Sequence, residues 1–81
     1  MRVRVLYFAS FRDAAGRAEE TREMPRGSCV SDLWALLAGE VPYLARFRQA
    51  PPVAVNRAYV GVGTALADGD EVAFLPPVAG G

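Results

Sequence analysis

The chain has 81 residues, carries nine basic and nine acidic side chains, and is 52% hydrophobic. This length allows one small domain, and the balanced charge argues against the clustered basic face that nucleic-acid binding needs. One cysteine, Cys29, and no histidine exclude an internal disulfide framework and the usual zinc ligand sets. No signal peptide is apparent, and no run approaches the roughly 20 apolar residues that cross a membrane. We therefore expect a cytoplasmic protein without metal, nucleic acid or membrane partners.

The first part of the chain predicts two antiparallel strands. Charged and apolar side chains alternate over residues 2–8, which is typical of a strand with one buried face. Residues 11–16 permit either one short turn of helix or a loop, ended by a glycine. Residues 19–24 are polar and charged, as suits an exposed strand at the edge of a sheet.

Helical spacing dominates the middle of the chain. After the break at residues 25–27, a helix is expected to begin at Ser28 or Cys29 and to end at Gly39. Trp34 is expected in the core beside the buried stripe of this helix. That stripe has three- and four-residue spacing and consists of Val30, Leu33, Leu36 and Leu37. Residues 42–48 predict a second short helix, closed by a pair of prolines.

The remaining pattern predicts three more strands and an α+β fold. The strands are expected at residues 53–56, 59–60 and 71–75, with a tight turn at 68–70. Strands on both sides of a helix in the chain imply one mixed sheet covered on one face. If the first and last strands are parallel neighbours in the middle, this is the β-grasp, or ubiquitin-like, layout. We expect a β-grasp domain over residues 1–75 and an extended tail over 76–81.

The chain ends in two glycines, and this ending suggests that the terminal carboxylate itself reacts. Gly80 and Gly81 lack side chains, so they can enter a slot too narrow for other residues. A frayed terminus would have the same composition. Pro76 and Pro77 would hold the start of the tail extended, although they could equally serve only to end a strand. A carboxylate with a pKa near ~3.5 is a poor electrophile at neutral pH and needs ATP to become an activated ester.

The last fourteen residues, 68–81, closely resemble the end of the MoaD family, the small subunits of molybdopterin synthase. Their sequence is DGDEVAFLPPVAGG, in which a turn and strand are followed by the proline pair and the terminal glycines. Earlier matches to the family's first strand, loop and mid-chain strand occur in the same order, at Val5–Ala9, Arg12-Asp13, Gly16 and Ala54–Asn56. The family often has a phenylalanine where this chain has Leu75 and a threonine where it has Ala79.

This resemblance implies a sulfur carrier with a ubiquitin-like fold and no bound cofactor. An activating enzyme, MoeB-like and related to ubiquitin-activating enzymes, would use ATP to adenylate Gly81. A sulfur donor would then convert the adenylate to a C-terminal thiocarboxylate. A MoaE-like large subunit, with which the family forms a heterotetramer, would accept the tail. The sulfur would pass to cyclic pyranopterin monophosphate in molybdenum cofactor biosynthesis. The chain itself would be non-catalytic, with the catalytic residues on the large subunit and Gly80 giving the tail clearance.

The resemblance also implies a surface for these partners. Phe8, Tyr59 and Leu75 occupy positions at which the MoaD family contacts its partners, and the strand pattern places Phe8 and Leu75 on the face that carries the arginines. An exposed apolar cluster of this kind usually marks an interface. The alternative is that the alternation slips and the three residues belong to the core. The interface would continue along the tail through Pro76, Pro77, Val78 and Ala79.

Other functions stay open at this level. Carriers for thiamine synthesis or tRNA thiolation, and ubiquitin-like protein modifiers, use the same tail chemistry. A β-grasp binding module without tail chemistry is a third class. Cys29 lies at a helix start, where a thiolate is favoured. It could therefore take part in a sulfur relay, or it could simply cap or pack the helix.

Overall fold

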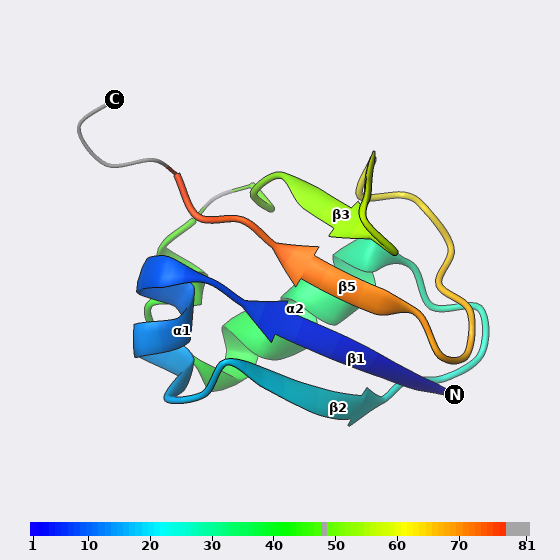
Figure 1. Ribbon diagram of the computed structural model, residues 1–81, viewed down its shortest axis with the longest axis horizontal. Helices are drawn as coiled ribbons and strands as arrows, with labels where there is room; N and C mark the ends of the chain where they lie inside the picture. Colours follow the sequence, from blue (N-terminus) through cyan, green and yellow to red (C-terminus); the bar gives the residue numbers. More distant parts are fainter. Residues whose placement is uncertain (48, 78–81) are drawn as a thin grey trace.

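The computed structural model describes residues 1–47 and 49–77, and the described part contains one mixed sheet of five strands. The strands lie in the order β2-β1-β5-β3-β4 (Figure 1). β1 and β5 run parallel, and every other neighbouring pair is antiparallel. The bounds are β1 (Arg2–Tyr7), β2 (Glu19–Glu23), β3 (Val53–Val55), β4 (Ala58–Val60) and β5 (Glu71–Phe74). The two parallel central strands confirm the predicted β-grasp layout, and β2 lies at the edge as expected.

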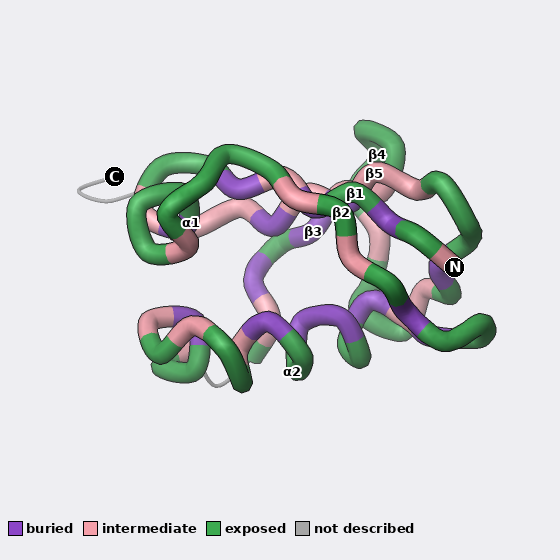
Figure 2. Tube along the Cα trace, turned by 90° about the horizontal axis from the view of Figure 1, so that it is seen from below, coloured by how far each residue is buried: buried purple, intermediate pink, exposed green. Residues whose placement is uncertain are grey.

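A second layer, formed mainly by one long helix, covers one face of this sheet. The long helix α2 (Val30–Glu40) runs beneath the strands, and the buried parts of the two layers face each other (Figure 2). α1 (Ala9–Ala15) follows β1 and ends at Gly16, which has a left-handed φ of 77°. The second short helix is a single 3₁₀ turn, η1 (Leu44–Arg46), shorter than the predicted span of 42–48. No helix of the described residues covers the opposite face of the sheet.

Helix α2 begins where the sequence indicated, and Cys29 is its N-cap residue. The backbone amide of Cys29 donates a hydrogen bond to the Asp32 carboxylate at 2.8 Å, which satisfies one of the free donors at the helix start. This hydrogen bond, followed by a weaker one from the Cys29 thiol, lowers the pKa of Asp32. The capping interpretation of Cys29 is confirmed.

Two details of the predicted helix α2 are wrong. Leu36 is 37% exposed, because the buried stripe consists of Val30, Leu33, Trp34 and Leu37, at the ideal spacing of i, i+3, i+4 and i+7. Gly39 does not end the helix, which continues to Glu40. The C-cap is Val41 in an extended conformation, because the following Pro42 restricts the residue before it to that region. Trp34 lies in the core as predicted and is 8% exposed.

A polar network fastens the edge strand to the helix layer. The Tyr7 hydroxyl donates to the Glu20 carboxylate at 2.7 Å, and the Arg22 guanidinium bridges Glu20 and Glu40 at 3.1 and 2.7 Å. Burial, and then the hydrogen bond to Glu20, raises the pKa of Tyr7. The hydrogen bond from Arg22 lowers the pKa of Glu40. β2 therefore stays attached although none of its five side chains is apolar.

The hairpin between β3 and β4 has a strained position that can be relieved. Its two loop residues, Asn56 and Arg57, have φ values of 51° and 72°, as in a type I′ turn, whose second position favours glycine. We expect Arg57→Gly to stabilise the fold by roughly 0.5–1 kcal/mol, measured as a higher urea midpoint with an unchanged m value. Arg26→Gly, at an exposed position without a positive φ, is the matched control and should not stabilise. An equal gain in both variants would contradict the strain argument.

Candidate functional site

The parallel pairing of the central strands brings Phe8 and the start of the tail to the same end of the sheet. The turn before β5 sets this register, because the Asp68 carboxylate accepts the Arg2 amide at 2.8 Å and the Asp70 carbonyl accepts the Arg4 amide at 2.8 Å. Leu6 then faces Ala73 across the ladder. One residue beyond the last pair of that register, Phe8 and Leu75 stand at the same level.

The uncovered face of the sheet is apolar at this end. A row of paired positions crosses four strands and consists of Leu6, Ala73, Ala54 and Tyr59. The two alanines make the centre of the row flat, so a partner's backbone or side chains can approach closely. We call Leu6, Phe8, Tyr59, Ala73 and Leu75 the apolar patch.

The exposure of the predicted interface residues places them outside the core. Phe8 is 45% exposed and Tyr59 is 75% exposed, both well above what a core aromatic residue shows. Leu75 is half-buried. By contrast Tyr7 and Phe74, the neighbours of Phe8 and Leu75 in the chain, are 2% and 0% exposed. The alternation therefore does not slip, and large apolar side chains are exposed on this face without a covering element in the described part of the chain.

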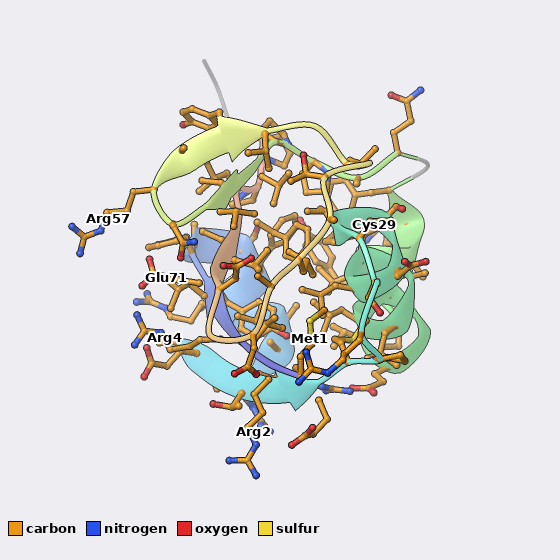
Figure 3. The ribbon with its side chains drawn as sticks, turned by 90° about the vertical axis from the view of Figure 1, so that its right-hand side faces the viewer. Met1, Arg2, Arg4, Cys29, Arg57 and Glu71 are labelled. Atoms are coloured by element: carbon orange, nitrogen blue, oxygen red, sulfur yellow. The ribbon has the colours of Figure 1, made fainter. Side chains whose placement is uncertain are left out.

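The other half of the same face is charged and internally paired. Arg2 pairs with Glu23 at 2.7 Å, Arg4 pairs with Glu71, and the Asn56 amide donates to the Asp70 carboxylate at 2.9 Å. Figure 3 shows Arg4 and Glu71 together on the side of the sheet away from the helix. Surface pairs of this kind contribute little stability, but they leave the apolar patch as the part of the face that is easiest to desolvate.

The tail begins from a fixed point. The Leu75 amide donates to the Pro52 carbonyl at 3.0 Å, which ties the residue after β5 to the residue before β3. Pro76 is half-buried and Pro77 is exposed, and the chain leaves the sheet here (Figure 1). Val78, Ala79, Gly80 and Gly81 lie outside the described residues, so their predicted roles stay predictions.

One group of residues near the tail was not predicted as part of the site. Tyr43, Arg46 and Phe47 line a groove together with Pro77, on the helix side of the tail base. The sequence carried a signal for it, since an arginine between two aromatic residues in one short segment is the composition typical of interface centres. Nothing in the sequence alone, however, placed that segment next to the tail.

Two kinds of site are absent from the described residues. No helix in residues 1–47 and 49–77 combines the length and the apolar character needed to cross a membrane. Within the same residues, no three side chains of the metal-binding types come together.

A parallel central strand pair, one covering helix and a tail that follows the last strand define a β-grasp protein of the ubiquitin-like class. The chain belongs to the ThiS family, whose model matches residues 5–81.

Relatives with known names support the resemblance seen in the sequence. The chain is 41% identical to the molybdopterin synthase sulfur carrier subunit of Chlamydomonas reinhardtii, with all of both chains covered. It is 40% identical to the protein of the same name from Mycobacterium tuberculosis, over 100% of this chain and 99% of the relative. The predicted membership of the MoaD family is thereby confirmed.

Solved structures have the same fold. SAMP1 from Haloferax volcanii superposes with a TM-score of 0.86 at 28% identity, with complete coverage of both chains. A complex of subunits 1 and 2 of molybdopterin-converting factor from Helicobacter pylori contains a chain that matches with a TM-score of 0.70 at 27% identity, again with complete coverage.

Proposed function

We propose that this chain is the sulfur carrier subunit of a molybdopterin synthase and that it carries sulfur as a thiocarboxylate on Gly81. The observation that carries the proposal is the juxtaposition of an exposed apolar patch with the start of a glycine-ended tail, at one end of the sheet. Relatives of the same length, at about 40% identity, have this name. The patch would bind the partner and the tail would deliver the reacting atom.

The chemistry follows from the carboxylate. One of its oxygens attacks the α-phosphorus of ATP on an activating enzyme, which we expect to be MoeB-like, and pyrophosphate leaves. Sulfur at the oxidation level of sulfide then replaces AMP at the carbonyl carbon. The resulting thiocarboxylate is a soft anionic nucleophile that can attack the pterin precursor, cyclic pyranopterin monophosphate. The chain supplies the carrier, and its partners supply the acid–base groups of each step.

The folded domain gives the tail a rigid base, and the number of tail residues limits how far Gly81 can extend from it. From Pro76 to Gly81 an extended tail spans about 20 Å, at ~3.3–3.6 Å per residue. The anchor at Leu75 fixes where this reach begins. The two prolines limit the conformations that must be given up when the tail enters a partner's site, which lowers the ordering cost of binding. We expect the tail to enter a MoaE-like large subunit in a cytoplasmic heterotetramer.

The intact mass of the protein isolated from its native cells tests the proposal. A fraction of the chains should be heavier by the replacement of one oxygen with one sulfur, and fragmentation should place that difference on Gly81. The same fraction should rise in cells that lack the pterin precursor, because the acceptor of the sulfur is then absent. Chains that carry only oxygen at Gly81 in both cells would refute the sulfur-carrier role.

A second function, the modification of other proteins, is favoured by one observation. Small archaeal modifier proteins from Haloferax volcanii and Methanosarcina acetivorans share the fold at 27–28% identity, with TM-scores of 0.80 to 0.86. If this chain acts in the same way, an affinity-tagged copy should be recovered in covalent conjugates of higher mass that disappear when Gly81 is deleted. Carriers for thiamine synthesis or tRNA thiolation would be recognised instead by a growth requirement for thiamine or by under-thiolated tRNA in a deletion strain.

A further inference from the structure

A groove on the helix side of the tail base presents an arginine to solvent. The groove is lined by Tyr43, Arg46, Phe47 and Pro77 and has a volume of about 450 Å³. Its walls are therefore two aromatic rings, a proline ring and a guanidinium group. Aromatic residues and arginine are the types enriched at the centres of protein interfaces.

The floor of the groove is fixed to the core. The rings of Tyr43 and Phe47 pack edge to face with a centroid distance of 5.5 Å, and Phe47 packs in the same way on buried Phe11 at 5.4 Å. Trp34 continues the cluster to Phe74 at 5.0 Å. Because these rings are held by one another, the groove is preformed and needs little ordering when a partner binds.

Arg46 is held in place while its donors stay accessible. Its guanidinium carbon lies 5.8 Å from the centre of the Tyr43 ring, at the distance of a cation–π contact. The arginines that pair with carboxylates within residues 1–47 and 49–77 are others, namely Arg2, Arg4, Arg17 and Arg22. A guanidinium stacked on a ring still presents a planar fork of N–H donors, which matches a carboxylate in a bidentate geometry.

The groove and the apolar patch lie on either side of the tail's first residues. Leu75 belongs to the uncovered face of the sheet, whereas Phe74 points into the core beneath it and Pro77 lines the groove. A protein that draws in the tail beyond Pro77 must therefore come close to both surfaces. A partner that binds the apolar patch and draws in the tail can therefore contact the groove as well.

We infer that this groove is a second docking contact for the large subunit that receives the tail, and that the large subunit fills it with an aspartate or glutamate. The carboxylate pairs with Arg46, and the neighbouring apolar atoms of the partner cover Tyr43 and Phe47. The inference rests on the proposed function, because that function supplies the partner. It adds a charged contact on the helix side to the apolar contact on the sheet side, so that the tail base is held from two directions.

Calorimetric affinities of the full chain for the large subunit from the same organism test this contact. We expect Arg46→Glu to weaken binding about ten- to a hundredfold, the range of a lost charge-assisted hydrogen bond, and Arg46→Gln to weaken it less, since no like charge is introduced. Arg26→Glu is the matched control. Arg26 is exposed and follows β2 at the end of the sheet that lies away from the tail. It should bind within about twofold of the wild type. Circular dichroism melts of each variant verify that the fold is intact.

A Phe8→Arg variant in the same series separates the two proposals. If Phe8→Arg weakens binding while Arg46→Glu and Arg46→Gln bind as the wild type does, the groove contact is wrong and the proposed function stands. If none of these variants weakens binding, neither the groove nor the apolar patch contacts the large subunit, and both proposals for docking are wrong. Restoration of the Arg46→Glu affinity by an acidic-to-lysine change in the large subunit would identify the partner's carboxylate. If the Arg46→Glu variant binds the large subunit weakly and no such change restores its affinity, Arg46 acts without a carboxylate partner and the inference is overturned.

Discussion

A chain extended by one alanine after Gly81 should lose sulfur delivery by at least about a hundredfold. The extra residue moves the reactive carbonyl carbon by ~3.3–3.6 Å relative to the fixed start of the tail. It also adds a methyl side chain at the position that must enter the narrowest part of a partner's site. Displacement of a reacting atom by only about 1 Å can cost about a hundredfold in rate. The effect should therefore be large although the folded body is unchanged.

Molybdopterin formation in a reconstituted reaction with the activating enzyme, the sulfur donor and the large subunit measures this loss. Intact mass must show that the added alanine is retained, because a protease that trims it would restore the native end. The extended chain should melt as the wild type does and should still bind the large subunit through the apolar patch. Undiminished product from a chain that keeps the alanine would mean that the terminal carbonyl is not the group that carries sulfur.

Phe8→Arg should weaken binding to the large subunit by about thirtyfold or more. Phe8 is 45% exposed beside Leu75 at the start of the tail, where an aromatic side chain has the character of an interface hot spot worth ~2 kcal/mol or more. An arginine there would have to be desolvated against a flat apolar surface, which adds a cost. Surface plasmon resonance with the immobilised large subunit measures the change.

Leu36→Arg provides the control for this variant. Leu36 is also an exposed apolar residue, 37% exposed, but it belongs to helix α2 on the covered side of the sheet. The same change in charge and size there should leave the affinity unchanged. Both variants should melt near the wild-type temperature. A large loss of melting temperature in Phe8→Arg alone would instead show that Phe8 supports the core.

Strands β1, β3 and β5 could be predicted from the sequence because their side chains alternate as in a half-covered sheet, whereas β2 was predicted as an exposed edge strand from its polar, charged composition. The buried residues of β1 are Val3, Val5 and Tyr7. Because successive side chains of a strand point to opposite faces, their burial predicts that Phe8 is exposed on the other face. The parallel pairing of β1 and β5 could not be predicted from the local sequence pattern. The β-grasp fold was predicted only on the assumption that these two strands pair. Their pairing depends on hydrogen bonds between residues 66 positions apart, such as that of the Arg2 amide to Asp68.

The errors in helix α2 have a local cause. Leu36 lies three residues after Leu33 and therefore fits a helical spacing. In the folded helix, however, Trp34 belongs to the buried stripe and Leu36 lies outside it. The predicted end at Gly39 relied on the preference of glycine for left-handed caps. The helix instead continues to Glu40 and ends at the C-cap Val41, where the following Pro42 restricts the backbone without any glycine.

The groove could not be found from the sequence, because it joins segments that are distant in the chain. Tyr43 and Phe47 follow helix α2, whereas Pro77 comes after the last strand. Their meeting depends on the packing of Phe11, Trp34 and Phe74 between them, which is a property of the whole core. Composition predicted the kind of residues at the site, and only the fold determined which of them meet.

The central place of β5 in the sheet also determines how the molecule responds to mechanical load. In the proposed cycle, any pull on the tail as a partner releases it would be transmitted to β5, which is flanked by β1 on one side and by β3 on the other. The ladder bonds on both sides lie across the direction of pull, so they resist in shear together and do not open one after another. If the chain inserts and withdraws its tail as proposed, this arrangement would let the tail be pulled out without unfolding the domain from its C-terminal strand.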